Sequence, residues 1–378
     1  MSTQNPIDIR QEFPIRERFT FLNHASVAPI PASTQAAISE FARAAAEEGP
    51  VNYSAWLHAM GVARETCAAM INADAQDICF IKNTNHGLLI VANSINWKAG
   101  DNVVGLEHEF PANLLPWKNL QAHGVEFRGV PERPDFTYSI DEIASRIDDR
   151  TRLLAVSWVE YSTGVRNDIE ALSRLCREKN ILFCVDGIQG LGVLPVDVEA
   201  LPIDFLMGDG HKWMLAPEGC GFLYVRRERI AELNDNMAGW CGMKNPQDYD
   251  NTDQGYKPTA RKFEEGSHNL LAINALGTSL RILQAAGYDF IQQRIRTTTT
   301  LLMERARKKN YEVVTPDNWE NRAGIVSLRK PGIDIDAVQK SLVDDHKIVI
   351  AARRGFFRVS PHFYNDEEEI EKLVSLLP

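Results

Sequence analysis

A histidine and a lysine stand side by side after a short apolar run in the segment DFLMGDGHKWM, residues 204–214. The run 203–207 predicts a buried strand, and the stretch 208–210, Gly-Asp-Gly, is expected to end it. A lysine in a desolvated pocket loses its proton easily and becomes a nucleophile that forms imines. The glycines would let the backbone approach a bound cofactor closely. Lys212 is therefore the candidate nucleophile, and His211 could donate to a phosphate.

Other residues that could take part in binding or catalysis also follow predicted strands. Thr84 and Asn85 lie between a strand and a helix, where they could form an ordinary N-cap or a phosphate site at the free N–H groups. Asp186 ends a buried apolar run, so its carboxylate needs a cation such as a protonated ring nitrogen, unless it only caps a turn. Phe110 could pack in the core or lie flat on a ring. Together with Lys212, these groups match one cofactor, pyridoxal 5′-phosphate.

The elements that must position these residues alternate along the first two thirds of the chain. We expect strands at 78–81, 103–106, 125–130, 153–157, 181–185, 203–207 and 221–225, and helices at 33–48, 54–70, 86–95, 113–122, 140–147 and 168–178. This alternation predicts parallel strands with helices on both faces of the sheet. Ligands of such sheets bind at the carboxyl ends of the strands, where the candidate residues lie.

The pattern changes after about residue 265. Two long helices, 269–285 and 288–309, precede a short α/β pattern with strands at 325–328, 348–351 and 356–359 and helices at 335–343 and 367–376. The segment 239–259 is rich in Gly, Asn, Asp and Pro and predicts a long loop of functional importance. We expect an α/β protein with a large cofactor-binding domain, residues 16–265, and a smaller α/β domain, residues 266–378 together with 1–15.

Composition narrows the class of protein. The 378 residues carry a formal net charge of −10, which argues against a nucleic-acid partner or an anionic membrane surface. The first residues hold no apolar run typical of a signal peptide, and no stretch has the length of a membrane span. The six cysteines show no CxxC pair and no Cys/His metal spacing. We therefore expect reduced packing cysteines, no metal site and a cytoplasmic protein.

Over nearly its whole length the sequence resembles the class V aminotransferase-type enzymes, which include cysteine desulfurases, isopenicillin N epimerase and kynureninase. The resemblance implies the type I fold of pyridoxal-phosphate enzymes. The stretch 186–189, Asp-Gly-Ile-Gln, is similar to the family's Asp-Gly/Ala-x-Gln element, in which Asp186 would pair with the pyridine nitrogen and Gln189 with the ring hydroxyl. His211-Lys212 is similar to the family's Schiff-base loop, and Thr84-Asn85 occupies its phosphate-binding Thr-Thr place.

Two further segments carry the resemblance. Residues 262–269 are similar to the Arg-Phe-Glu-x-Gly-Thr-Pro-Asn segment, whose hydroxyl residue reaches the phosphate of the neighbouring subunit, so Ser267 implies a homodimer with shared active sites. Arg358 matches the arginine that holds the α-carboxylate of an amino-acid substrate, for which a planar guanidinium is well suited. Asn23 and His24 are also expected to bind the substrate.

The chain departs from the desulfurases in three places. The segment 350–358 has no cysteine and no room for the long loop that carries their reactive thiol, which leaves Cys241 as the one loop candidate. Phe110 stands where desulfurases stack a histidine, as in kynureninase-like members, and a neutral ring cannot move protons. Asp209 replaces a small hydroxyl residue; an acid near a phosphate would repel it, so we expect Asp209 to point away and cap a helix.

The resemblance implies a reaction that begins with an amino acid held by Arg358. Lys212 would then remove or return the α-proton while Asp186 keeps the ring nitrogen protonated. We favour lyase or epimerase chemistry without a cysteine persulfide; the alternatives are a class V aminotransferase or a desulfurase-like sulfur transfer through Cys241. A binding protein without turnover is disfavoured because Lys212, Asp186 and Arg358 are all retained. A nucleotide-binding protein is disfavoured because no GxGxxG or GxxxxGK[ST] motif follows a strand.

Overall fold

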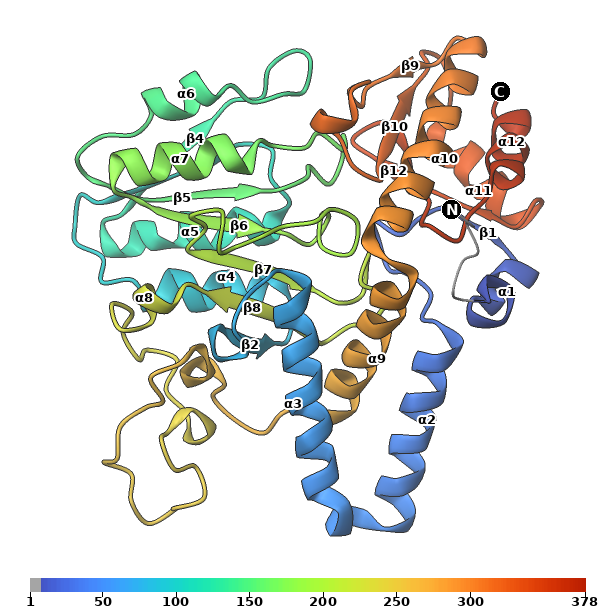
Figure 1. The fold of residues 1–378 in the computed structure, drawn as a ribbon. Helices are drawn as coiled ribbons and strands as arrows, with labels where there is room; N and C mark the ends of the chain where they lie inside the picture. Colours follow the sequence, from blue (N-terminus) through green and yellow to red (C-terminus); the bar gives the residue numbers. More distant parts are fainter. Residues whose placement is uncertain (1–7) are drawn as a thin grey trace.

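A seven-stranded sheet is the largest layer of the computed structural model, which describes residues 8–378 (Figure 1). Its strands, in the spatial order β2-β8-β7-β6-β5-β3-β4, are β2 (Ile78–Ile81), β3 (Asn102–Leu106), β4 (Glu126–Val130), β5 (Thr151–Ser157), β6 (Leu182–Asp186), β7 (Phe205–Asp209) and β8 (Gly221–Val225). Strand β8 is antiparallel to both neighbours, and the remaining pairs are parallel. The predicted mainly parallel sheet is confirmed. The carboxyl ends of β2, β3, β5, β6 and β7 therefore share one edge.

Helices cover both faces of this sheet. The helices α4 (Thr84–Ser94) and α5 (Leu115–Asn119) pack on one face, and α6 (Ile140–Ser145), α7 (Ile169–Lys179) and α9 (Leu270–Ala286) belong to the core on the other (Figure 1). Alternate residues of β7 divide between the two cores: Phe205 and Met207 face α4, whereas Leu206 faces the α7 side. Both faces are apolar because both are covered.

The predicted helix 113–122 is wrong. It is split into α5 and two flanking 3-10 turns, Pro111–Asn113 and Leu120–His123. Pro116 at the start of α5 has no N–H to continue a preceding turn, which forces a new helix start. Gly124, with φ of 76°, ends the segment in the left-handed conformation.

The glycines at the end of β7 also behave differently from the expectation. The strand runs on through Gly208 to Asp209, which pairs with Gly221 of β8. A Cβ on Gly208 would lie 2.9 Å from the Leu191 side chain, and one on Gly210 would lie 2.9 Å from the carbonyl oxygen of Cys220. These glycines therefore permit close packing inside the protein rather than close approach to a cofactor.

The C-terminal part has its own sheet, in the order β12-β13-β10-β9, with antiparallel pairing. Its strands are β9 (Glu312–Val313), β10 (Val326–Arg329), β12 (Ala351–Arg353) and β13 (Phe356–Val359), with helices α10 (Tyr288–Lys308), α11 (Ile335–Asp344) and α12 (Glu367–Leu376). The predicted strand 348–351 is divided between β11 (Ile348–Val349) and β12. The short β1 (Thr20–Phe21), which the sequence analysis missed, pairs in parallel with β11. The boundaries 16–265 and 266–378 with 1–15 stay a prediction, and residues 1–7 lie outside the described residues.

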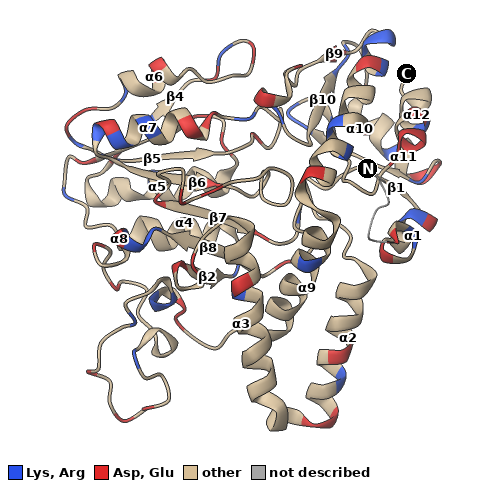
Figure 2. Cartoon of the chain, in the orientation of Figure 1, with Lys and Arg blue, Asp and Glu red and all other residues tan. Residues whose placement is uncertain are grey.

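A helical hairpin projects from the body of the molecule. It consists of α2 (Ala32–Glu47) and α3 (Tyr53–Met70), and α9 packs beside both (Figure 1). Figure 2 shows few charged residues on these three helices, while acidic and basic residues are interspersed over the rest of the chain. Among residues 8–378, no helix combines the length and apolar character needed to cross a membrane.

All six cysteines are free thiols and buried. Cys220 lies in the turn immediately before β8. Within residues 8–378 no group of His, Cys, Asp and Glu side chains forms a metal site. The expectation of a cytoplasmic protein stays a prediction.

A buried ion pair fixes the segment that follows the long loop. The Arg64 guanidinium contacts both oxygens of Glu264 at 2.6 and 3.1 Å, and the Phe80 N–H donates to the same carboxylate at 2.9 Å. Burial alone would raise the pKa of Glu264, but Arg64 and His268 outweigh it and lower the pKa to about 2. The carboxylate thus ties residues 262–269 to α3 and β2.

Replacing Glu264 by Ala should lower the free energy of unfolding by about 3–5 kcal/mol, because Arg64 would stay buried without its counter-charge. Urea unfolding of the cofactor-free protein measures the loss. Arg174→Ala removes an exposed pair with Glu170 and should cost less than about 1 kcal/mol. Equal, small losses in both variants would contradict this account.

Candidate active site

A cavity of about 430 Å³ lies at the carboxyl edge of the large sheet, a size typical of cofactor sites. Its walls come from the ends of β5, β6 and β7, from the start of α4, from residues 25–27 and from the β12–β13 hairpin. The predicted residues that line it are Thr84, Asn85, Phe110, Asp186, Gln189, His211, Lys212 and Arg358. Asn23, His24 and Ser267 lie outside this lining.

Lys212 is buried in the cavity wall. Burial lowers the pKa of its amine to about 8, against an opposing effect of Asp186, and Arg358 adds to the lowering. The lysine Nζ lies 5.5 Å from the centre of the Phe110 ring, which is itself 45% exposed and so is not a core aromatic. An amine with a lowered pKa beside an aromatic face is suited to bind a carbonyl cofactor.

Hydrogen bonds from the N-terminal and the C-terminal part of the chain fix the backbone on either side of Lys212. The Ala28 N–H donates to the carbonyl oxygen of His211 at 2.8 Å. The His362 ring accepts the Phe363 N–H at Nδ1, so its Nε2–H donates to the carbonyl oxygen of Trp213 at 3.0 Å. These two contacts fix the lysine between the N-terminal segment and the C-terminal part.

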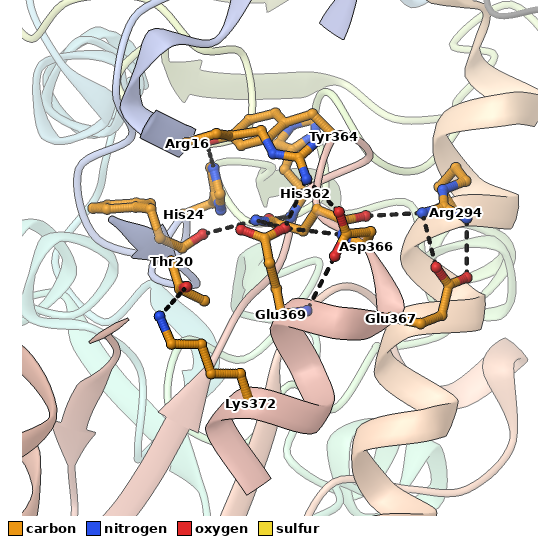
Figure 3. A network of polar contacts seen from close by, with 12 residues as sticks. Arg16, Thr20, His24, Arg294, His362, Tyr364, Asp366, Glu367, Glu369 and Lys372 are labelled. Atoms are coloured by element: carbon orange, nitrogen blue, oxygen red, sulfur yellow. Dashed lines mark hydrogen bonds and ion pairs between the residues drawn. The ribbon is translucent and has the colours of Figure 1, made fainter. Parts of the chain in front are cut away.

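Figure 3 shows a polar network that includes His24, His362 and Tyr364. His24 is fully buried there: its Nδ1 lies 2.9 Å from the carbonyl oxygen of Ser360, and its Nε2 lies 2.6 Å from the Tyr364 hydroxyl. Burial lowers the pKa of His24 well below its usual range. Both ring nitrogens are already bonded and the ring does not reach the cavity. The structure therefore does not place His24 where a substrate would bind.

Asp186 ends β6 and faces the cavity from a buried position. Burial raises the pKa of its carboxyl to about 6, although the Ile188 N–H and Lys212 oppose this rise. A protonated ring nitrogen would supply the missing counter-charge. Gln189 accepts the Trp213 ring N–H at 2.7 Å and donates to the carbonyl oxygen of Ala25 at 3.1 Å, so one amide hydrogen stays free.

The N-terminus of α4 lies at one end of the cavity, where a phosphate group could bind. Asn83, rather than Thr84 or Asn85, caps the helix, because its side chain accepts the His86 N–H at 2.9 Å. Thr84 and Asn85 are the first two helical residues, whose N–H groups have no partner within the helix and favour a phosphate. The Thr84 hydroxyl also accepts the Asp209 N–H at 3.0 Å.

Asp209 does not cap a helix, so this expectation is wrong. Its side chain lines the cavity, with Oδ2 3.0 Å from Nδ1 of His211, while its Oδ1 is buried without a hydrogen-bond partner among residues 8–378. The contact is possible because Asp209 is the last residue of β7 and His211 follows two positions later. The Asp209 carboxylate therefore lies beside the imidazole that was expected to reach a phosphate, without a hydrogen bond between the two groups.

Arg358 reaches the cavity from β13. Its guanidinium donates to the carbonyl oxygen of Tyr161 at 2.8 Å and to the Ser26 hydroxyl at 2.6 Å. The Ser26 hydroxyl in turn donates to Asn23 Oδ1 at 2.9 Å, so a chain of hydrogen bonds connects Asn23 to Arg358 through Ser26. Burial lowers the pKa of Arg358 to about 9, and its buried Nε has no hydrogen-bond partner in the described part of the chain. A substrate carboxylate would satisfy this group.

Ser267 and Cys241 lie elsewhere. Ser267 lines a separate cavity of about 160 Å³ together with Lys82 and Glu265. Cys241 is buried in the long loop, burial raises the pKa of its thiol, and it does not line the Lys212 cavity. Within one chain, the structure therefore brings neither residue to Lys212.

Sequence reasoning overlooked several residues of the site. Ser26, Tyr161 and Arg353 line the cavity, and buried Glu109 accepts the Ser157 N–H at 2.6 Å beside it. Tyr161 and Glu109 follow predicted strands, so their position at the edge of the sheet was expected, but no role was assigned to them. Ser26 and Arg353 carry no local pattern that marks them.

Residues 20–373 match the family model for Aminotransferase class-V. The chain belongs to the class V aminotransferase family. Its cofactor is pyridoxal 5′-phosphate, and the cavity fits that group: a helix N-terminus for the phosphate, Asp186 for the ring nitrogen, Phe110 for the ring face and Lys212 for the carbonyl carbon. The family expected from the sequence is confirmed, and the protein is an enzyme of this family.

Known relatives cover almost the whole chain. A probable cysteine desulfurase of Methanothermobacter thermautotrophicus is 30% identical over 97% of this chain and 96% of its own. A solved cysteine desulfurase of Thermococcus onnurineus has a TM-score of 0.88 at 24% identity, covering 99% of this chain and 97% of its own. The cystine C–S lyase C-DES, solved with cysteine persulfide, has a TM-score of 0.89 at 23% identity, covering 96% and 98%. The solved structures confirm the type I fold.

Reduction of the cofactor-loaded protein with borohydride should attach the cofactor to the single peptide that contains Lys212, because this lysine combines burial with a lowered pKa. Peptide mass spectrometry identifies the site. Lys212→Ala should stay folded by circular dichroism and carry no label. A label on any other lysine would refute the assignment.

Proposed function

We propose that the protein is a lyase that acts on an amino acid and eliminates a β-substituent without forming a persulfide on the protein. The observation that supports this is the content of the cavity. It holds Lys212 and Arg358, and no cysteine among residues 8–378 lines it. A persulfide mechanism needs a thiolate that can reach the substrate sulfur, and burial raises the pKa of the loop thiol Cys241.

Each residue has a physical role in this proposal. Pyridoxal phosphate, when bound, stabilises negative charge at the substrate α-carbon. Arg358 binds the α-carboxylate through its fork of N–H donors and so orients the α-hydrogen. Lys212, with its lowered pKa, accepts that proton and can return it. Asp186 holds the proton on the ring nitrogen, and Phe110 covers one ring face without exchanging protons.

Sulfur transfer through Cys241 is the second candidate, because the relative from Methanothermobacter is named a probable cysteine desulfurase. The position of Cys241 disfavours sulfur transfer. The residue is the middle one of the 3-10 turn Trp240–Gly242, and Lys257 donates to its carbonyl oxygen, so its backbone is held in place. Epimerisation uses the same Lys212 and Arg358. Inversion at the α-carbon with the β-substituent retained, measured by chiral chromatography, would distinguish it from elimination.

We further propose a homodimer with shared sites, in which Ser267 contacts the phosphate bound by the other subunit. Ser267 lies in the cavity next to Lys82 rather than in the Lys212 cavity of its own chain. Exposed apolar residues support a partner surface: Val51 is 81% and Tyr53 44% exposed near the tip of the hairpin that Figure 1 shows projecting from the body.

Incubation of the enzyme with cysteine or cystine should give pyruvate rather than alanine if either compound is a substrate, because elimination leaves an unsaturated product that hydrolyses to the keto acid. Cys241→Ser should keep the wild-type product and a similar rate. Alanine formed from cysteine, its loss in Cys241→Ser and a persulfide trapped on Cys241 would together overturn the proposed chemistry.

Hybrid dimers test the shared site. Lys212→Ala and Ser267→Glu chains should each be inactive, the second because a carboxylate would repel the phosphate. After random subunit exchange, half of the dimers are hybrids with one intact site, so about one quarter of the wild-type activity should return. A monomer with bound cofactor, an active Ser267→Glu enzyme or no recovery in proven hybrids would contradict the shared site.

A further inference from the structure

The β12–β13 hairpin carries two arginines toward the same cavity. Its ladder places Ala351 opposite Arg358, and Arg353 follows Ala351 by two residues, so Arg353 and Arg358 lie on one face of the hairpin. Such diagonal neighbours have Cα atoms about 7–8 Å apart. Both side chains line the Lys212 cavity. The register of one hairpin thus explains why two guanidinium groups face a single site.

The next residue along the chain has a structural partner. Arg354 forms a bidentate ion pair with the buried Glu132, at 2.9 and 2.8 Å, and its positive φ of 50° with that of Gly355 makes the tight turn of the hairpin. This pair anchors the hairpin to the large sheet. Arg353 therefore projects from a fixed backbone.

Arg353 is solvent-exposed and has no such partner among residues 8–378. Its one hydrogen bond goes to the neighbouring carbonyl group of Ala352, at 2.7 Å, and no carboxylate of residues 8–378 lies within ion-pair distance. The two carboxylates that line the cavity have other neighbours: Asp186 would face the ring nitrogen of the cofactor, and Asp209 lies 3.0 Å from His211. The charge of Arg353 also adds to the lowering of the pKa of Arg358 and Lys212.

We propose that Arg353 binds a second anionic group of the substrate, which makes the substrate class amino acids that carry an acidic group beyond the α-carboxylate. The inference rests on the proposed function, in which Arg358 takes the α-carboxylate. The second anion would form an ion pair with the solvent-exposed Arg353 guanidinium, and it would offset the repulsion between the two arginines that line the cavity. Amino acids with short neutral side chains fill the same space but leave Arg353 without a partner.

Two unreactive four-carbon acids test this in the cofactor-loaded enzyme. Succinate has two carboxylates and butyrate has one, so their binding by calorimetry isolates the second anion. The wild type should bind succinate about 10-fold more tightly than butyrate. Arg353→Gln should reduce succinate binding to the level of butyrate and leave butyrate binding unchanged. Arg353→Lys should keep part of the preference, since it retains the charge but not the fork.

The matched control is Arg329→Gln, which removes an exposed cation of the same sheet that does not line the cavity and should retain the succinate preference. Equal binding of the two acids by the wild type, or a preference that survives Arg353→Gln, would overturn the role of Arg353. Arg358→Gln should lose butyrate binding, which tests the α-carboxylate site alone. Formation of pyruvate or another elimination product by the wild type, measured separately, tests the proposed function independently of Arg353. Failure of the wild type to bind either acid would refute both arginine assignments.

Discussion

The burial of one lysine amine is the constraint on which the rest of the site depends. Water is the best solvent for an ammonium group, so a buried lysine is held at a cost that lowers its pKa, here to about 8. The same burial makes the neutral, nucleophilic amine available near physiological pH. The surrounding groups adjust the pKa of Lys212 further. Asp186 opposes the lowering of this pKa, Arg358 and Arg353 add to it, and Phe110 places an aromatic ring beside the amine.

Precise placement of that amine needs contacts from distant parts of the chain. The sheet brings Asp186 and the segment after β7 together because β6 and β7 are parallel neighbours. The flanking carbonyl groups of Lys212 are then held by Ala28 from the N-terminal segment and by His362 from the C-terminal part. Arg358 is likewise fixed by Ser26 and Tyr161, which lie far from it in sequence. The cavity thus exists only when the whole chain is folded.

The sequence predicted those features that depend on local pattern. Asp186 and Lys212 could be found because both follow apolar runs that form parallel strands, and such strands deliver their next residues to one edge. The helix cap was misplaced by one residue, to Thr84 instead of Asn83, because several polar residues there could serve as a cap. The end of β7 was misplaced because glycine usually interrupts strands, whereas Gly208 is required here by the close packing of Leu191.

The remaining features depend on tertiary contacts and could not be predicted locally. Ser26 belongs to the site only because Arg358 reaches across to it. His24 was expected to bind the substrate, yet its ring nitrogens contact the Ser360 carbonyl oxygen and, as Figure 3 shows, the Tyr364 hydroxyl in the interior. Arg353 and Arg354 are indistinguishable in sequence, and only the hairpin register and Glu132 separate a cavity residue from an anchor.

The pKa of Lys212 tests the central claim most directly. Lysine labelled with carbon-13 at Cε can be titrated by NMR in the cofactor-free protein, with Lys212→Arg to assign the signal. The account predicts a pKa of about 8 for Lys212, and a still lower pKa in Asp186→Asn, because removal of the nearby carboxylate takes away a group that stabilises the ammonium. A Lys212 pKa near the ordinary lysine value of about 10.4, unaffected by Asp186→Asn, would contradict it.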